Sequence, residues 1–136
     1  MGSARIAATD AAPVRAVLTL VGAVALVAGL WGVATGIDGM AGDSAGTANV
    51  DSEIRFFAVL WAAYGAVVLR TAPRAQREPI VVRALMLVLF CAGVSRAISW
   101  ADEGRPDTVY VILLALELTV PPLVLWLQAR APARRA

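Results

Sequence analysis

Four long apolar segments separated by short polar connections make up most of the chain. They cover about residues 14–37, 52–70, 80–100 and 108–128. About 20 apolar residues in a helix cross a hydrocarbon core of roughly 30 Å, and these runs lack the alternation of barrel strands. The pattern therefore predicts one membrane domain over residues 1–136, an all-α integral membrane four-helix bundle.

The first apolar segment has two possible interpretations. Arg5 and Arg15 precede it, as basic residues precede the apolar core of a secretory signal. A signal core is roughly 7–15 residues long, however, and the charge-free run that begins after Arg15 is longer. We therefore expect this segment to be retained as the first membrane span.

Composition narrows the possible chemistry. Apolar residues make up 60% of the chain, against roughly 45–50% in ordinary soluble domains. The chain has no histidine and a single cysteine, Cys91, which removes His-ligated zinc, bis-His haem, histidine-based acid–base catalysis and an intrachain disulfide. We expect no metal, no cofactor and no enzymatic activity. The arginines are scattered around apolar segments, which also argues against nucleic-acid binding.

Charge predicts the orientation in the membrane. If both termini and residues 71–79 lie on one side, nine of the twelve arginines lie there, against Arg105 in the opposite loops. By the positive-inside rule this side is cytoplasmic. We therefore expect a multi-pass protein of the cytoplasmic (inner) membrane with both termini in the cytoplasm. The nine arginines are Arg5, Arg15, Arg70, Arg74, Arg77, Arg83, Arg130, Arg134 and Arg135.

Small residues recur at helical spacing in the first two segments. Helices in a membrane associate through close packing of small residues, because lipid is as apolar as leucine. Spacings of three and four residues predict one packing face on each helix, although an Ala/Gly-rich sequence also produces such stripes by chance. The predicted packing residues are Gly22, Ala25, Gly29, Gly32 and Gly36 on the first helix and Ala58, Ala62 and Gly65 on the second.

Charged residues open the second apolar segment. Asp51 and Arg55 are four residues apart with the acid first, the favoured order for a helical ion pair. Asp51 or Ser52 is also suited to cap the helix. Arg55 shares the small-residue face, so we expect it to face protein. Together with Glu53, these charges form either an interfacial cap and ion pair or part of a functional polar site.

Arg96 and Glu117 are predicted to form a second pair. By helical rise, Arg96 lies about 6 Å and Glu117 about 14 Å below the outer membrane boundary, and their side chains lean toward one another from antiparallel helices. Pro121 and Pro122 leave backbone carbonyls without amide donors, and the Thr119 hydroxyl is expected at a similar depth. The pair either fixes helix register or lines a small polar cavity for a proton, ion or ligand.

Three segments carry a family resemblance. They are DSEIRFFAVLWAAYGAVVLR from residue 51, VRALMLVLFCAGVSRAISW from residue 82 and ALELTVPPLVLW from residue 115. The chain resembles a bacterial family of small four-helix membrane proteins, domain of unknown function 4345. The resemblance implies four membrane helices and no assigned activity. Its most specific matches are Asp51, Ser52, Glu53, Arg55 and Phe56, then Arg96, Ser99 and Trp100, then Glu117, Pro121 and Pro122.

Two functions fit these features. The first is a structural or accessory subunit, or a partner of a larger membrane complex, since no nucleotide-binding loop, metal cluster or nucleophile–base pair is present in the sequence. The second is a small proton-coupled transporter or carrier of an amphiphilic ligand that uses Glu117. The expected partners are membrane lipid and other membrane-protein subunits or a second copy of the chain, not nucleic acid.

Overall fold

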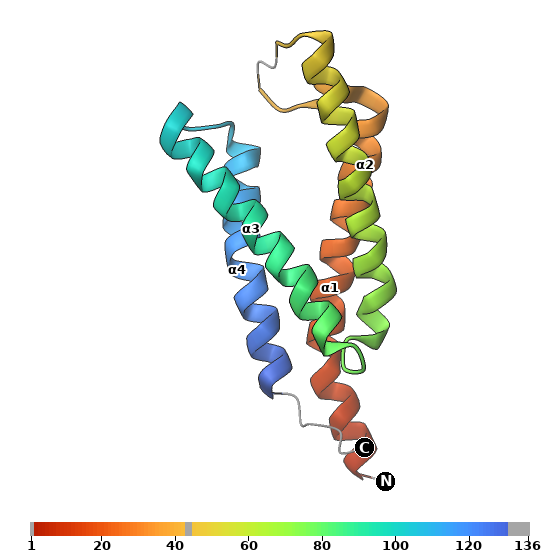
Figure 1. Ribbon diagram of the computed structural model, residues 1–136. Coiled ribbons are helices and arrows are strands. Elements are labelled where there is room, and N and C mark those ends of the chain that lie inside the picture. Colours follow the sequence, from red (N-terminus) through yellow and green to blue (C-terminus); the bar gives the residue numbers. More distant parts are fainter. Residues whose placement is uncertain (1, 43–44, 131–136) are drawn as a thin grey trace. The chain divides into compact units, whose positions relative to one another are not determined.

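The computed structural model describes residues 2–42 and 45–130, with side chains from residue 12 onward. Its described part is helical, which confirms the all-α prediction (Figure 1). The helices in chain order are α1 (Gly2–Thr35), the 3-10 turn η1 (Gly36–Gly39), α2 (Ala48–Thr71), the 3-10 turn η2 (Ala72–Arg74), α3 (Pro79–Glu103) and α4 (Thr108–Arg130).

Four stretches are long and apolar enough to cross a membrane, as the sequence predicts. They are Ala12–Gly39, Ala48–Arg74, Pro79–Glu103 and Thr108–Arg130. The chain is therefore a multi-pass membrane protein. Except at residue 108, each span extends beyond its predicted bounds. The helical hydrogen bonds continue into polar residues at the membrane boundary, and hydropathy does not count these residues as part of the span.

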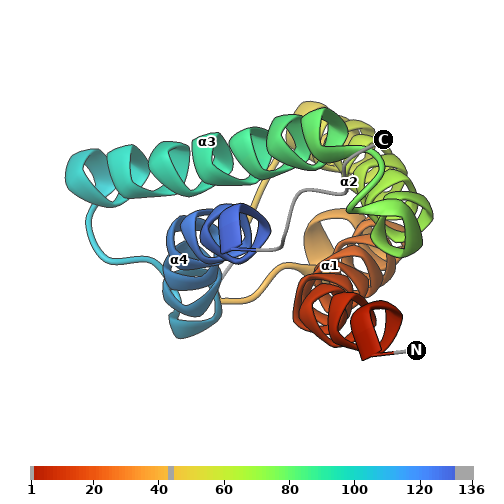
Figure 2. The same cartoon turned by 90° about the horizontal axis from the view of Figure 1, so that it is seen from below.

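The chain divides into two compact units. One unit contains residues 18–70, and the other contains residues up to 17 together with residues from 71 onward. In the first unit, α1 and α2 lie side by side and run in opposite directions, as Figures 1 and 2 show. In the second unit, α3 and α4 form an antiparallel pair.

Glycines bring α1 and α2 into backbone contact. A Cβ atom at Gly29 would meet the backbone nitrogen of Ala62 and lie 2.7 Å from the carbonyl oxygen of Ala58. A Cβ atom at Gly65 would likewise meet the backbone of Leu26. The structure thus places the small-residue stripes of the two helices against each other. Contacts at Gly22 and Gly32 extend this interface, and Ala25 is buried.

One face of α3 and one face of α4 are buried. On α3 the buried residues follow spacings of four, three and four, and on α4 they follow spacings of four and three, so each set forms a single helical stripe. At Gly93 a Cβ atom would lie 3.0 Å from the Cβ atom of Glu117, so the glycine permits close approach of α4. The buried residues are Val82, Met86, Leu89 and Gly93 on α3 and Glu117, Pro121 and Val124 on α4.

Prolines occur inside two helices without ending them. Pro13 lies within α1, which begins well before the predicted start at residue 14. Pro121 and Pro122 lie within α4. Because proline has no amide hydrogen, the carbonyl groups of Glu117 and Leu118 lack their usual helical donors. Because α4 nevertheless continues without a break, Glu117 and Gln128, which are about three turns apart, lie on the same side of the helix.

Candidate functional site

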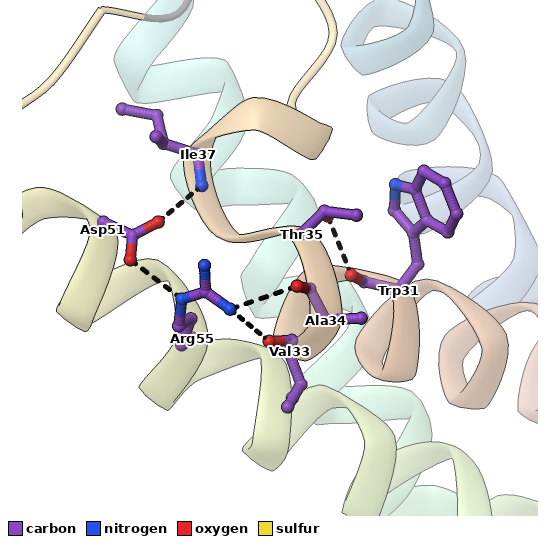
Figure 3. Close-up of polar contacts among 7 residues, drawn as sticks. All are labelled: Trp31, Val33, Ala34, Thr35, Ile37, Asp51 and Arg55. Carbon is purple, nitrogen blue, oxygen red and sulfur yellow. Dashed lines mark hydrogen bonds and ion pairs between the residues drawn. The ribbon is translucent and has the colours of Figure 1, made fainter.

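Asp51 and Arg55 form the predicted ion pair at the start of α2. Arg55 Nε donates to Asp51 Oδ2 at 2.8 Å (Figure 3). The side chains retain 42% and 31% exposure for Arg55 and Asp51 respectively. The pair therefore lies at the edge of the helix pair and is not enclosed by it.

The Arg55 guanidinium also binds the end of α1. Its Nη1 donates to the carbonyl oxygen of Val33 at 2.6 Å and to that of Ala34 at 3.2 Å. The last carbonyl groups of a helix have no amide partner within that helix, so they are ready acceptors. A cation at this end also suits the helix dipole. Arg55 thus caps α1 from the neighbouring helix and faces protein, as its position on the stripe predicts.

Asp51 binds the same turn through its second carboxylate oxygen. Oδ1 accepts the amide hydrogen of Ile37 at 2.9 Å, and Figure 3 shows how the carboxylate bridges Ile37 and Arg55. The prediction that Asp51 or Ser52 caps α2 is wrong, because the helix begins at Ala48. Both residues already lie inside it, and the Asp51 side chain serves the end of α1 instead.

Gly36 makes this arrangement possible. Its φ angle of +59° is left-handed, a conformation that glycine adopts without steric cost. A Cβ atom here would collide with Asp51 Oδ1 and lie 2.6 Å from Arg55 Nη2. The sequence predicts Gly36 as a packing residue, but what packs on it is the charged pair and not an apolar side chain.

Glu53 does not join this cluster. It is exposed on α2, and no hydrogen bond or ion pair to it is found among residues 2–42 and 45–130. Residues two positions apart on a helix point in directions about 200° apart, so Glu53 cannot share the face of Asp51 and Arg55. Of the three charges that open α2, only two contribute to the site.

Arg96 and Glu117 join α3 to α4, the contact predicted from their depths. Arg96 Nε donates to Glu117 Oε2 at 2.8 Å. The Glu117 side chain is only 4% exposed, whereas that of Arg96 is 35% exposed. The guanidinium also lies 5.6 Å from the centre of the Tyr110 ring, a cation–π contact that the sequence did not reveal. The pair is therefore asymmetric, with a buried acid and a half-buried base.

Thr119 does not contribute to this second site. Its hydroxyl donates to the Ala115 carbonyl oxygen at 2.7 Å and is exposed. Depth alone predicts that Thr119 lies near Glu117. Two residues turn a helix by about 200°, however, so the two side chains point in nearly opposite directions. In the described part of the chain, no group of three or more Cys, Asp or Glu residues is placed to hold a metal ion.

The comparison with protein families decides the classification. The family model "Domain of unknown function (DUF4345)" matches residues 13–128. The chain belongs to this family. The match covers the second and third membrane spans, nearly all of the first and fourth, and both arginine–carboxylate pairs, and the family description assigns no activity. No curated protein and no solved structure matches the chain.

Backbone partners of Arg55 and Asp51 are the main features that sequence reasoning missed. The carbonyl groups of Val33 and Ala34 and the amide of Ile37 exist at every position of a chain, so they leave no residue-specific signal. Gly36 is the one residue-specific signal for these contacts, because a glycine at the end of an apolar helix is typical of a left-handed helix terminus. Tyr110 carries a weaker hint, since it lies seven residues before Glu117 on the same helical face.

Proposed function

We propose that the protein is a structural or accessory subunit of an assembly in the cytoplasmic membrane. The observation that carries this proposal is that the charged side chains of both arginine–carboxylate pairs bind groups on a neighbouring helix. Arg55 and Asp51 bind backbone groups of α1, and Arg96 binds Glu117 across α3 and α4. Each pair connects two helices and stabilises a rigid helix pair, which is the requirement for a packing partner.

Large apolar side chains on the outer face of α2 support the same proposal. Phe56, Phe57 and Leu60 are exposed in the single chain, and the two phenylalanine rings meet edge to face at 5.4 Å between centroids. Exposed aromatic residues are enriched in contacts between protein subunits, and in a membrane they face either lipid or a neighbouring protein. They offer a surface for association that leaves the charged pairs undisturbed.

Purification from native membranes tests the accessory role. The full chain, tagged and expressed at its natural level, is extracted in mild detergent, and the stoichiometry of every associated protein is measured. We expect one partner in fixed ratio, lost in a Phe56→Ala/Phe57→Ala variant that unfolds at the same temperature as the wild type. Leu20→Ala, an exposed change on α1, is the matched control. Recovery of the chain alone, with lipid only, would contradict the proposal.

A second candidate function is proton-coupled transport of an amphiphilic ligand. One observation favours it: Glu117 is a nearly buried carboxyl group within a membrane span, and it forms an ion pair with Arg96. Ionisable groups at such depth commonly belong to proton or ion pathways. In this case a second copy of the chain completes the pathway, and protonation of Glu117 releases Arg96 during each cycle.

Transport in vesicles separates the two candidates. Purified protein is reconstituted into vesicles with an imposed pH gradient, and a pH-sensitive dye reports proton flux after addition of the lipophilic cation tetraphenylphosphonium. The accessory role predicts no flux beyond protein-free vesicles. A flux present in the wild type and in Glu53→Gln, but absent in Glu117→Gln, would establish the carrier instead.

A further inference from the structure

Three polar atoms without hydrogen-bond partners are buried in the turn between α2 and α3 and at the end of α4. They are Thr71 Oγ1, Gln76 Nε2 and Gln128 Oε1, and none forms a hydrogen bond within the described residues. Thr71 as a whole has an exposed fraction of 0%. Folded proteins contain few such groups, because each loses the hydrogen bond that it makes with water in the unfolded chain. These three atoms therefore call for a partner.

One hydrogen bond fixes the orientation of the Gln128 side-chain amide. Its Nε2 donates to the carbonyl oxygen of Ala75 at 3.1 Å and holds the end of α4 against the turn that precedes α3. If the amide were turned over, two acceptor oxygens would face each other, so the unpartnered atom of Gln128 is its oxygen. This acceptor is held close to the peptide group that joins Ala75 to Gln76.

Thr71 and Gln76 belong to the same turn as Ala75. The backbone continues from α2 into η2, with right-handed helical angles at Thr71 and Ala75. Thr71, Ala72 and Ala75 are buried, whereas the two residues between Ala72 and Ala75 are exposed. Because residues three or four apart on a helix share a face, Thr71 and Ala75 point into the same interior region. Gln76 follows Ala75 directly, and its Nε2 atom is buried as well.

The three atoms offer complementary hydrogen-bonding groups that do not bond to one another. Gln76 Nε2 donates, Gln128 Oε1 accepts, and the Thr71 hydroxyl does both. A cation does not suit the hydrogen atoms of Nε2, and an anion does not suit Gln128 Oε1. The set therefore fits a neutral molecule that both donates and accepts. Water has this property, and a buried water typically forms about three hydrogen bonds to such groups.

Water is available at this end of the membrane spans. Thr71 lies near the end of the span Ala48–Arg74, and Gln128 lies near the end of the span Thr108–Arg130. Successive spans cross the membrane in opposite directions, so these two ends lie at the same membrane boundary. We propose that Thr71, Gln76 and Gln128 bind ordered water, which joins the turn between α2 and α3 to the end of α4. This hydration site is independent of the proposed accessory role.

Thr71→Val tests the site through the sign of its effect on stability. Valine has nearly the same shape as threonine but no hydroxyl group. If the hydroxyl binds water, the variant loses a hydrogen bond, and the equilibrium constant for unfolding in detergent should rise about 3- to 10-fold. If the site is dry, the variant removes an unpaired buried group and the constant should fall, which would overturn the proposal. Thr119→Val is the matched control, because this exposed hydroxyl bonds within its own helix, and it should change the constant by less than about twofold.

Nuclear magnetic resonance detects the bound water directly. The full chain, labelled with ¹⁵N in deuterated detergent, is examined for rotating-frame Overhauser contacts between water and the side-chain amide hydrogens of Gln128. Such contacts differ in sign from hydrogen exchange. We expect them in the wild type and in Thr119→Val, and we expect them to weaken in Thr71→Val and in Gln76→Met. The second variant keeps the test open if the first fails to fold. Absence of the contacts in the wild type, or equal contacts in all variants, would overturn the proposal.

Discussion

The carboxylate of Asp51 accepts the amide hydrogen of Ile37 at 2.9 Å across a sequence separation of 14 residues. Its other oxygen binds Arg55, and Arg55 in turn binds the carbonyl oxygen of Val33. The start of α2 therefore binds the end of α1 through charge-assisted hydrogen bonds. Such bonds are about twice as strong as neutral ones, so this joint is expected to stabilise the helix pair.

Replacing Arg55 with lysine tests whether the guanidinium geometry matters. Arg55 reaches Asp51 through Nε and two carbonyl groups through Nη1, and a single ammonium group cannot hold the same directions. We expect Arg55→Lys to lower the free energy of unfolding in detergent by about 1–2 kcal/mol, because charged hydrogen bonds are lost at a partly exposed position. Denaturant titration followed by tryptophan fluorescence measures the change.

A lysine variant as stable as the wild type would show that charge alone suffices. Glu53→Gln provides the matched control on the same helical turn, because Glu53 is exposed and outside the cluster. It should change the unfolding free energy by less than about 0.5 kcal/mol.

Gly36→Ala tests the space around this joint. An alanine in the left-handed conformation costs about 1–2 kcal/mol, and its Cβ atom also displaces Asp51 and Arg55. The destabilisation should therefore exceed the conformational cost in the wild type. In an Asp51→Ala/Arg55→Ala background the collision disappears, so the same substitution should cost only the conformational part. Equal losses in both backgrounds would mean that the two charges do not occupy the space beside Gly36.

Gly29→Leu tests the contact between α1 and α2. The added side chain meets the backbone of Ala62 and Ala58, which cannot move aside as a flexible side chain can. We expect the variant to unfold or aggregate in detergent, measured by size-exclusion chromatography and circular dichroism. Ala28→Leu introduces the same side chain on the exposed face of α1 and should leave both readouts unchanged. Similar behaviour of the two variants would remove the case for a packing stripe.

Much of the architecture follows from local sequence features. The four spans follow from apolar length, and the Asp51–Arg55 pair follows from the four-residue spacing that aligns side chains on one helix. The Arg96–Glu117 pair follows from depth and from antiparallel helix direction. Each of these inferences needs only helix geometry and the cost of charge in hydrocarbon, both of which act on identifiable residues.

Other features depend on tertiary placement and leave no such pattern. The bonds from Arg55 to α1 involve backbone groups that every residue carries. Depth alone predicts Thr119 near Glu117, but Thr119 points to a different side of α4, where its hydroxyl donates to the Ala115 carbonyl oxygen. The hydrogen bond between Gln128 and Ala75 joins segments 53 residues apart. No spacing rule connects residues at that distance.

Reporter fusions test the orientation predicted from the arginine distribution. Fusions after Ala45 and Gly104 should report the outer side, and fusions after Gln76 and Ala136 should report the cytoplasm, because most arginines then lie inside. Paired phosphatase and fluorescent reporters at each position supply internal controls. The reverse pattern at all four positions would invert the topology, and a cytoplasmic signal at Ala45 would remove the first span.

A double-mutant cycle on Arg96 and Glu117 tests most directly that the membrane charges serve to join helices. Arg96→Met and Glu117→Gln should each lower the free energy of unfolding in detergent, by about 1–3 kcal/mol for a buried group left without its partner. The Arg96 change should cost more, since it strands the nearly buried Glu117. A parallel cycle of Glu117 with Arg83, an exposed arginine earlier on α3, is the control and should be additive. The double Arg96→Met/Glu117→Gln variant should recover at least about 1 kcal/mol relative to the sum of the single changes. If the losses of the two single variants simply add in the double variant, as they should in the control cycle, the structural role of the pair is contradicted.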